Sequence, residues 1–268
     1  MCATNKLKEQ INQIWDLYDE NSSLDLTPIY EIIKKLDDGE LRAAHKVGQT
    51  WFVNEYVKKA ILLYFKFQKS ELMPDNFCNC YDKVPMKTAN WTEKNFIDAG
   101  FRMVPGSIIR YGSFIGQSSV IMPSFINIGV YIGEGTMIDS NSLVGSCAQI
   151  GMGCHISDGV TIGGVLEPLQ STPVIIEDNC FIGVRSSVTE GVIVEEGSVI
   201  GAGVSLTSST RIIDRKSGNV FYGKVPAYSV VVPGSYSKDG VNLYAAIIVK
   251  QVDEKTRDKT AINDLLRM

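Results

Sequence analysis

The sequence has little of what would place it in several large classes of protein. Its 268 residues contain no run of about 18 apolar residues, the length that a membrane-spanning helix requires. The first ten residues are polar and lack the apolar segment of a signal peptide. The net charge is only −4, which provides no electrostatic basis for binding nucleic acid or an anionic membrane. These absences predict a globular protein of the cytoplasm, without a membrane or nucleic-acid partner.

Residues that bind metals are also scarce. The chain has two histidines, His45 and His155, and six scattered cysteines. Cys78 and Cys80 form the only close cysteine pair, and neither a second pair nor a histidine lies near them in the sequence. A structural zinc site normally combines four such ligands. We therefore predict no metal site, and we expect the cysteines of a cytoplasmic chain to be reduced.

The middle of the chain carries a six-residue repeat. Aliphatic residues recur at this period in three registers: Ile109, Ile115 and Ile121; then Ile126, Ile132, Ile138, Val144, Ile150, Ile156 and Ile162; then Ile176, Ile182, Val188, Val194, Ile200, Leu206 and Ile212. The residue two positions before each of them is small or is valine, and glycine often follows. Neither a helix period of 3.6 nor a plain alternation explains a six-residue period that is shared by the aliphatic residues and by the small residues two positions before them.

This pattern predicts a β-solenoid. Residues two apart in a strand point to the same face, so the aliphatic residue and its small partner both point inward. Six residues then supply one short strand and one turn, and glycine tolerates the turn dihedrals. Three such sides close one triangular coil. The break between Ile162 and Ile176 is two residues longer than two repeats, and we interpret 163–175 as an external loop of the kind that often carries function.

The two flanks of the repeat have a different character. Apolar residues at helical spacing predict helices before residue 100, with Thr27 and Pro28 typical of a helix start. Beyond the repeat, 243–252 is predicted as a strand and 261–266 as a short helix. We therefore divide the chain into a helical N-terminal domain (1–103), a β-helix (104–232) and a C-terminal extension (233–268). The flanks are expected to cover the open ends of the solenoid.

Long segments of the repeat resemble the tetrahydrodipicolinate N-succinyltransferase family of hexapeptide acyltransferases. The resemblance lies in 101–106, 122–129, 134–139, 144–151, 162–170, 176–183, 190–199 and 255–267. It implies a mainly β fold, a left-handed parallel β-helix. It also implies that succinyl-CoA donates its succinyl group to the amine of ring-opened tetrahydrodipicolinate, giving N-succinyl-2-amino-6-oxopimelate and CoA in the diaminopimelate and lysine pathway. Family members work as homotrimers with active sites between subunits, and three-fold symmetry suits a triangular prism.

The resemblance also assigns roles to single residues. The acceptor carries two carboxylates, which the planar fork of arginine binds well, and Arg102 and Arg185 are the candidates. Asp139 matches the family aspartate that lies beside the substrate amine, so we expect it to orient the amine and accept a proton. His155 neighbours inward residues and should point outward, where a groove between subunits would lie.

The sequence departs from the family at one position of this site. Many relatives carry a glutamate where this chain has Ser187, and a serine hydroxyl cannot act as a base near neutral pH. Either Asp139 and water suffice, or Glu190 or a neighbouring subunit supplies a carboxylate. We prefer the first interpretation, because Glu190 is itself matched by a glutamate in relatives.

The acyl-CoA donor should bind where small residues leave the backbone accessible and where cations are available. Glycine-rich turns at Gly163, Gly164, Gly201 and Ala202 would let the pantetheine arm approach the backbone, whose N–H groups can stabilise a thioester oxyanion. Arg215, Lys216 and Lys224 are candidates for the cofactor phosphates. Cys147 is expected to be a packed small residue, because direct transfer needs no covalent cysteine.

Two other functions compete with this one. The same scaffold could carry another CoA-dependent N- or O-acyltransferase, acting for example on an amino sugar or on serine. Hexapeptide solenoids also serve as assembly modules or as metal enzymes, although a metal enzyme of this type needs more histidines than this chain has. A preference for acetyl-CoA over succinyl-CoA would distinguish the first alternative from succinyl transfer. A pure assembly module, in contrast, would not bind coenzyme A.

Overall fold

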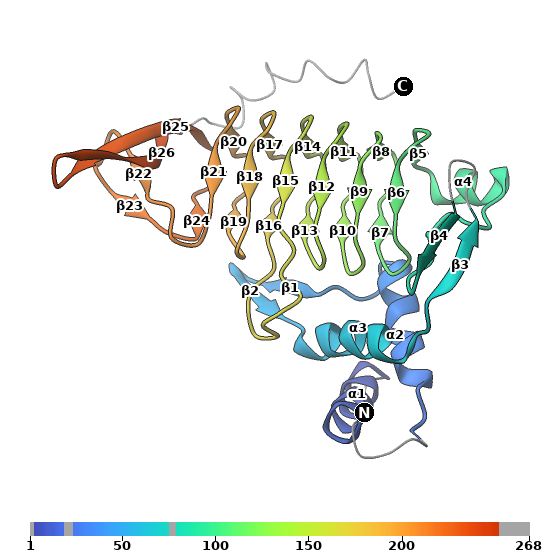
Figure 1. The fold of residues 1–268 in the computed structure, drawn as a ribbon. Helices are drawn as coiled ribbons and strands as arrows, with labels where there is room; N and C mark the ends of the chain where they lie inside the picture. The colour runs from blue at the N-terminus through green and yellow to red at the C-terminus, as the bar shows by residue number, and fades with distance from the viewer. Residues whose placement is uncertain (1–2, 19–23, 75–78, 252–268) are drawn as a thin grey trace.

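The protein is a three-sided β-helix with a helical domain along one side (Figure 1). The computed structural model describes residues 3–18, 24–74 and 79–251. Each coil contributes one two-residue strand to each of three faces. On each face, the strands of successive coils pair in parallel. The mainly β, left-handed parallel β-helix predicted from the repeat is confirmed.

We number the three faces in the order in which the chain visits them. Face 1 consists of β5 (Arg102–Met103), β8 (Val120–Ile121), β11 (Met137–Ile138), β14 (His155–Ile156), β17 (Phe181–Ile182) and β20 (Val199–Ile200). Face 2 consists of β6 (Ile108–Ile109), β9 (Phe125–Ile126), β12 (Leu143–Val144), β15 (Thr161–Ile162), β18 (Ser187–Val188) and β21 (Ser205–Leu206). Face 3 consists of β7 (Phe114–Ile115), β10 (Tyr131–Ile132), β13 (Gln149–Ile150), β16 (Ile175–Ile176), β19 (Ile193–Val194) and β24 (Lys224–Val225). The edge where the chain turns from face 1 to face 2 is called the 1–2 edge, and the next is the 2–3 edge.

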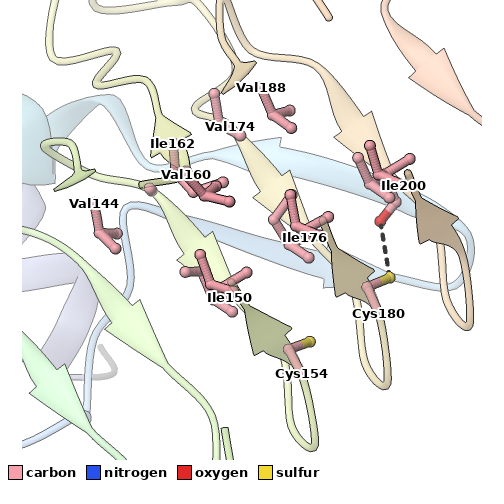
Figure 2. Packing of buried hydrophobic residues seen from close by; sticks show 14 of the residues in the cluster. Val144, Ile150, Cys154, Val160, Ile162, Val174, Ile176, Cys180, Val188 and Ile200 are labelled. Atoms are coloured by element: carbon pink, nitrogen blue, oxygen red, sulfur yellow. Dashed lines mark hydrogen bonds between the residues drawn. The ribbon is translucent and has the colours of Figure 1, made fainter. Parts of the chain in front are cut away.

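The aliphatic columns form the interior of the prism. All of the repeat positions from Ile109 to Ile212 are buried, and the strand registers place them directly above one another. Figure 2 shows this stacking, with Val144, Ile162 and Val188 from face 2 beside Ile150 and Ile176 from face 3. Because the strands are parallel, each coil places its aliphatic side chains in one layer of the interior. Every coil therefore repeats the same packing.

The N-terminal segment packs against face 3 and the 2–3 edge. Its helices are α1 (Ala3–Leu17), α2 (Thr27–Asp37), α3 (Glu55–Phe67) and α4 (Glu93–Ala99). The apolar faces of α1, α2 and α3 share one cluster with Ile128 and Cys147 of the solenoid. Two antiparallel hairpins, which the helical spacing did not predict, interrupt the helices: β1 (Ala44–Val47) with β2 (Thr50–Val53), and β3 (Glu71–Pro74) with β4 (Asn79–Asp82).

The external loop lies between the helical domain and the solenoid. Residues 163–174 leave the coil after β15 and return at β16, and Figure 1 shows the loop descending toward β1, β2 and α3. Lys58 of α3 is completely buried, and its Nζ donates to the carbonyl oxygen of Ser171 at 2.6 Å. Burial lowers the pKa of Lys58, because a low-dielectric surrounding disfavours the charged ammonium. Leu166 packs on the helical cluster, so the loop is held at two points.

We expect Lys58→Met to loosen this loop without unfolding the protein. Methionine keeps the length of the side chain but removes the donor to Ser171, and a hydrogen bond from a charged group contributes about 1.5–3 kcal/mol. Hydrogen exchange of the amides in 165–174 should therefore accelerate about tenfold or more. Lys59→Met is the matched control, because the neighbouring Lys59 donates to Asn12 on α1 instead. Equal exchange in the two variants would contradict the role of Lys58.

The C-terminal end of the prism is covered by a long hairpin. β25 (Ser229–Lys238) pairs in parallel with β20 of face 1 and antiparallel with β26 (Val241–Gln251). β26 in turn pairs with β22 (Ile212–Asp214), which pairs with β23 (Val220–Phe221). The strand predicted at 243–252 is part of β26, and the predicted helix at 261–266 lies outside the described residues. No described helix is both long and apolar enough to cross a membrane.

Candidate functional site

The turns along the 1–2 edge bring several of the predicted site residues into one line. Successive coils place the turns that begin at Asp139, Ser157, Gly183 and Gly201 above one another. The backbone N–H of Arg185 donates to Asp158 in the coil below, and that of Gly203 donates to Val184. Since parallel strands lie about 4.8 Å apart, the turn of Arg185 is about 10 Å from that of Asp139.

Asp139 presents one carboxylate oxygen to this edge. Its Oδ1 accepts the backbone N–H of Ser140 at 2.7 Å, which fixes the direction of the side chain. Its Oδ2 lies 3.7 Å from Nε2 of His155, and the Asp139 side chain is 28% exposed. The imidazole of His155 packs against the ring of Phe181 on the outside of face 1. Oδ2 is therefore the oxygen that accepts no backbone hydrogen bond from Ser140 and lies beside His155.

Arg185 leans along the edge toward the coil of Asp139. It adopts a left-handed backbone conformation with φ of 54°, and its stem crosses Gly159, where a β-carbon would come within 3.4 Å of the arginine Cγ. Gly159 itself has φ of +64°, a left-handed conformation that favours glycine at this position. The Arg185 stem thus lies against the turn of Asp158 and Gly159, and Asp158 accepts a hydrogen bond of 3.1 Å from the side chain of Asn141 in the turn of Asp139.

Arg102 lies on face 1 near the N-terminal end of the prism. β5 pairs with β8, which pairs with β11, so Arg102 is two coils before Met137 and Asp139. Its side chain is exposed. One chain therefore holds an arginine about 10 Å to either side of Asp139 along the prism axis.

The four residues predicted to contact the pantetheine arm separate into two places. Gly201 and Ala202 lie on the 1–2 edge, in the coil that follows Arg185. The backbone N–H of Ala202 donates no hydrogen bond within the described part of the chain. Gly163 and Gly164 instead lie on the 2–3 edge, against the backbone of Gly145. Face 2 separates the two places within one chain.

The three candidates for the cofactor phosphates lie near the C-terminal end. Arg215 and Lys216 are exposed in the turn after β22. Lys224 is on β24 of face 3, where its Nζ forms an ion pair with Glu195 at 2.6 Å. Within one chain, these cations are not brought to the 1–2 edge.

Ser187 and Glu190 occupy different surroundings. Ser187 points outward on face 2 and donates to the hydroxyl of Ser205 at 3.0 Å. Glu190 lies in the turn at the 2–3 edge, where its carboxylate accepts from the backbone N–H and hydroxyl of Ser208. Glu190 is thus on another edge of its own chain than Asp139 and already has partners.

Cys147 is enclosed beneath the helical domain. Its side chain is completely buried, and burial raises the pKa of the thiol to about 12. A thiol of this kind is not ionised near neutral pH and has no access to an acyl donor. Within the described residues, no three His, Cys, Asp or Glu side chains lie close enough together to hold a metal ion.

Asn141 and Asp158 were not singled out from the sequence, although they form part of the same edge. A signal for this position does exist. The residues with positive φ on the 1–2 edge are Gly106, Asn141, Gly159, Arg185 and Gly203, and each is the third residue of its turn. In the sequence, the signal is a residue other than glycine at a turn position that is glycine in other coils. A left-handed residue other than glycine at such a position is uncommon and points to a functional or structural constraint.

Family models match three segments of the chain. Residues 6–67 match the family described as "Tetrahydrodipicolinate N-succinyltransferase N-terminal". Residues 129–164 match "Bacterial transferase hexapeptide (six repeats)", and residues 173–208 match "Hexapeptide repeat of succinyl-transferase". The first of these matches covers the segment in which the sequence motifs were weakest.

Curated relatives show the same similarity at high identity. The chain is 56% identical to the 2,3,4,5-tetrahydropyridine-2,6-dicarboxylate N-succinyltransferase of Pelagibacter ubique over 96% of its own length and 97% of the relative's. It is 56% identical to the enzyme of that name from Acinetobacter baylyi, covering 89% of this chain and 88% of the relative. A solved N-succinyltransferase structure from Campylobacter jejuni aligns with a TM-score of 0.59 at 15% identity, over 81% of this chain and 61% of that one, and supports the fold.

Proposed function

The chain belongs to the tetrahydrodipicolinate N-succinyltransferase family, and from this premise we propose that its 1–2 edge is the place where an acceptor amine meets an acyl donor. The protein is an acyltransferase of the diaminopimelate and lysine pathway, which transfers a succinyl group to tetrahydrodipicolinate. One observation carries the assignment of the site. Asp139, Arg185, Gly201 and Ala202, which were chosen for different chemical reasons, lie in line on one edge.

Asp139 is the proton acceptor of the proposed reaction. Hydration and opening of the cyclic imine free an amine, and its nitrogen forms a bond to the thioester carbonyl carbon. The nitrogen loses a proton to Oδ2 of Asp139, and the carbon–sulfur bond then breaks. The departing sulfur takes up that proton, so CoA leaves as the thiol and Asp139 becomes a carboxylate again. Oδ1 is occupied by Ser140, so a single oxygen performs this step. Ser187 contributes no base, and we propose that Asp139 and water suffice.

The arginines bind the two carboxylates of the acceptor. Arg102 and Arg185 lie on opposite sides of Asp139 along the prism axis. Each guanidinium can hold a carboxylate with two parallel hydrogen bonds, which positions the amine between them. This arrangement suits a dicarboxylate better than the amino sugars and serine of the alternative acyltransferases.

Succinyl-CoA is the proposed donor, and no metal takes part. The free N–H of Ala202 is available to the thioester oxygen, whose negative charge grows during the attack. Gly163, Gly164, Arg215 and Lys224 lie away from this edge in their own chain. We therefore propose that they bind the donor at the edge of a neighbouring subunit, in a cytoplasmic homotrimer.

Exposed apolar side chains beside the 1–2 edge support this assembly. Ile108 and Leu143 on face 2, Phe181 on face 1 and Val184 on the edge itself are each about two-fifths exposed. A second copy of the chain would remove these side chains from water, which favours association. The site of each chain would then be completed by its neighbour.

The test is a thiol-release assay with tetrahydrodipicolinate and either succinyl-CoA or acetyl-CoA, combined with sedimentation analysis. We expect release that depends on the acceptor, at least tenfold faster with succinyl-CoA, from a trimer. Preference for acetyl-CoA, or release only with an amino sugar or serine, would favour the alternative acyltransferases. An active monomer would contradict the shared site.

A further inference from the structure

A cavity lies on the side of the molecule where β1 and β2 meet the solenoid. Its volume is about 370 Å³, which is within the range of small-molecule pockets. Arg42, Lys46 and Trp51 line it from the hairpin region, and the turns at Gly151 and Asp178 line it from the edge between faces 3 and 1. None of the residues assigned to the transfer reaction contributes to this cavity.

Arg42 offers an unoccupied guanidinium fork to the cavity. Its Nε donates to Oε1 of Gln149 at 2.8 Å, and its guanidinium carbon lies 3.8 Å from the ring centre of Tyr131. Within the described residues, its two terminal nitrogens donate no hydrogen bond, and no carboxylate lies within 4.0 Å of them. Burial lowers the pKa of Arg42, because the charge is removed from water and the charges of Tyr131 and Asp178 offset this only in part. A carboxylate is the ligand that such a fork binds best.

Three carboxylates also line the cavity, and two of them, Asp178 and Glu196, form no ion pair within 4.0 Å in the described part of the chain. Glu177 is satisfied, since Lys46 pairs with it at 2.6 Å and the indole of Trp51 donates to it at 2.7 Å. Asp178 accepts a backbone N–H from Met152 at 2.8 Å, but neither Asp178 nor Glu196 forms an ion pair in the described part of the chain. Ammonium groups are the natural complement of these two side chains.

The charges and the apolar surface together define the class of ligand. The cavity is lined by two cations and three carboxylates, which leaves one negative charge in excess. A diamino monocarboxylic acid carries two ammonium groups and one carboxylate, and so one positive charge in excess. The thioether of Met152 and the indole of Trp51 provide apolar contact for an aliphatic stem.

We propose that this cavity binds a free diamino monocarboxylic acid, with its carboxylate on Arg42 and its ammonium groups on Asp178 and Glu196. L-Lysine is a member of the class, and the family acts in the pathway that leads to it. The site is separate from the 1–2 edge, so a ligand here would report the level of a pathway product rather than compete with the acceptor.

Isothermal titration calorimetry of the full chain tests the proposal. We expect L-lysine to bind with one site per chain. L-Norleucine, which lacks the side-chain ammonium, and 1,5-diaminopentane, which lacks the carboxylate, should each bind at least about tenfold more weakly, because each leaves one charged wall unpaired. Absence of binding by L-lysine, or equal binding of all three compounds, would overturn the proposal.

Two variants assign the binding to this cavity. Arg42→Gln should abolish the preference for L-lysine over 1,5-diaminopentane, and Glu196→Gln should reduce the preference over L-norleucine. Lys238→Gln, which removes a cation from the distant hairpin of β25, is the control and should bind like the wild type. Circular dichroism establishes that each variant is folded. If Arg42→Gln fails to fold, Glu196→Gln decides alone, and unchanged binding in it would refute the assignment.

Discussion

Asp139→Asn is expected to lower kcat for succinyl transfer by at least about 100-fold, the usual contribution of a proton acceptor. Asparagine is nearly the same size, and its oxygen can still accept the N–H of Ser140, so the turn should keep its shape. What disappears is the negative oxygen that takes the proton from the attacking amine. The KM values for both substrates should change little, because the binding arginines remain in place. Steady-state thiol release as a function of both substrates measures these constants.

Two further variants show whether the loss is specific. Asp98→Asn makes the same chemical change on α4, an exposed helix at the N-terminal end of the solenoid, and should leave kcat unchanged (Figure 1). Ser187→Ala removes a hydroxyl that donates to Ser205, and it should retain most of the activity if Asp139 and water suffice. Normal turnover in Asp139→Asn would exclude this aspartate as the proton acceptor. A large loss in Ser187→Ala would show that the serine takes part after all.

Gly145→Ala is expected to destabilise the β-helix by more than about 3 kcal/mol, at or above the upper end of ordinary overpacking. A β-carbon at this position would lie 2.2 Å from the backbone nitrogen of Gly164 and 2.6 Å from its Cα, in the next coil. Backbone atoms cannot rotate away as a side chain can, so the two coils must separate. Thermal unfolding measured by circular dichroism gives the change in stability.

Gly135→Ala separates this steric effect from the conformational cost of losing a glycine. Gly135 has φ of +66° and no atom within 4 Å of its would-be β-carbon, so alanine there costs about 1 kcal/mol for the left-handed backbone alone. Gly145 has no such dihedral requirement, and its substitution is penalised by contact with the neighbouring coil. Similar melting temperatures for the two variants would show that the coils can separate without cost. Gly145→Ala should also displace Gly163 and Gly164 on the same edge and so weaken donor binding.

Much of the solenoid was predictable because its interactions are nearly periodic. Each coil buries one aliphatic column per face, so the six-residue period in the sequence corresponds directly to the interior. The hairpins β1–β2 and β3–β4 were missed for the opposite reason. Their side chains are largely exposed and carry no alternating apolar pattern that could be distinguished from the helical stripes around them.

The individual chemical groups of the proposed site could be chosen from the sequence, but their arrangement could not. Asp139 and Arg185 are 46 positions apart in the sequence. The excursion at 163–174 lies between them, so counting six-residue repeats does not predict that they share an edge. The structure shows that this excursion returns in register, so that both residues lie on the 1–2 edge. It also separates Gly163 and Gly164 from Gly201 and Ala202, which the sequence treated as one group.

The sequence by itself determined the repeat, the identity of the inward residues and the family, because each depends on local spacing or on long motifs. Only the tertiary structure decided which turns share an edge, that Lys58 holds the external loop, and that Arg42, Asp178 and Glu196 line one cavity. The last two features bring together residues more than one hundred positions apart. Nothing in the local pattern of charge or hydropathy encodes such contacts, because they arise only when the helical domain packs against the completed prism.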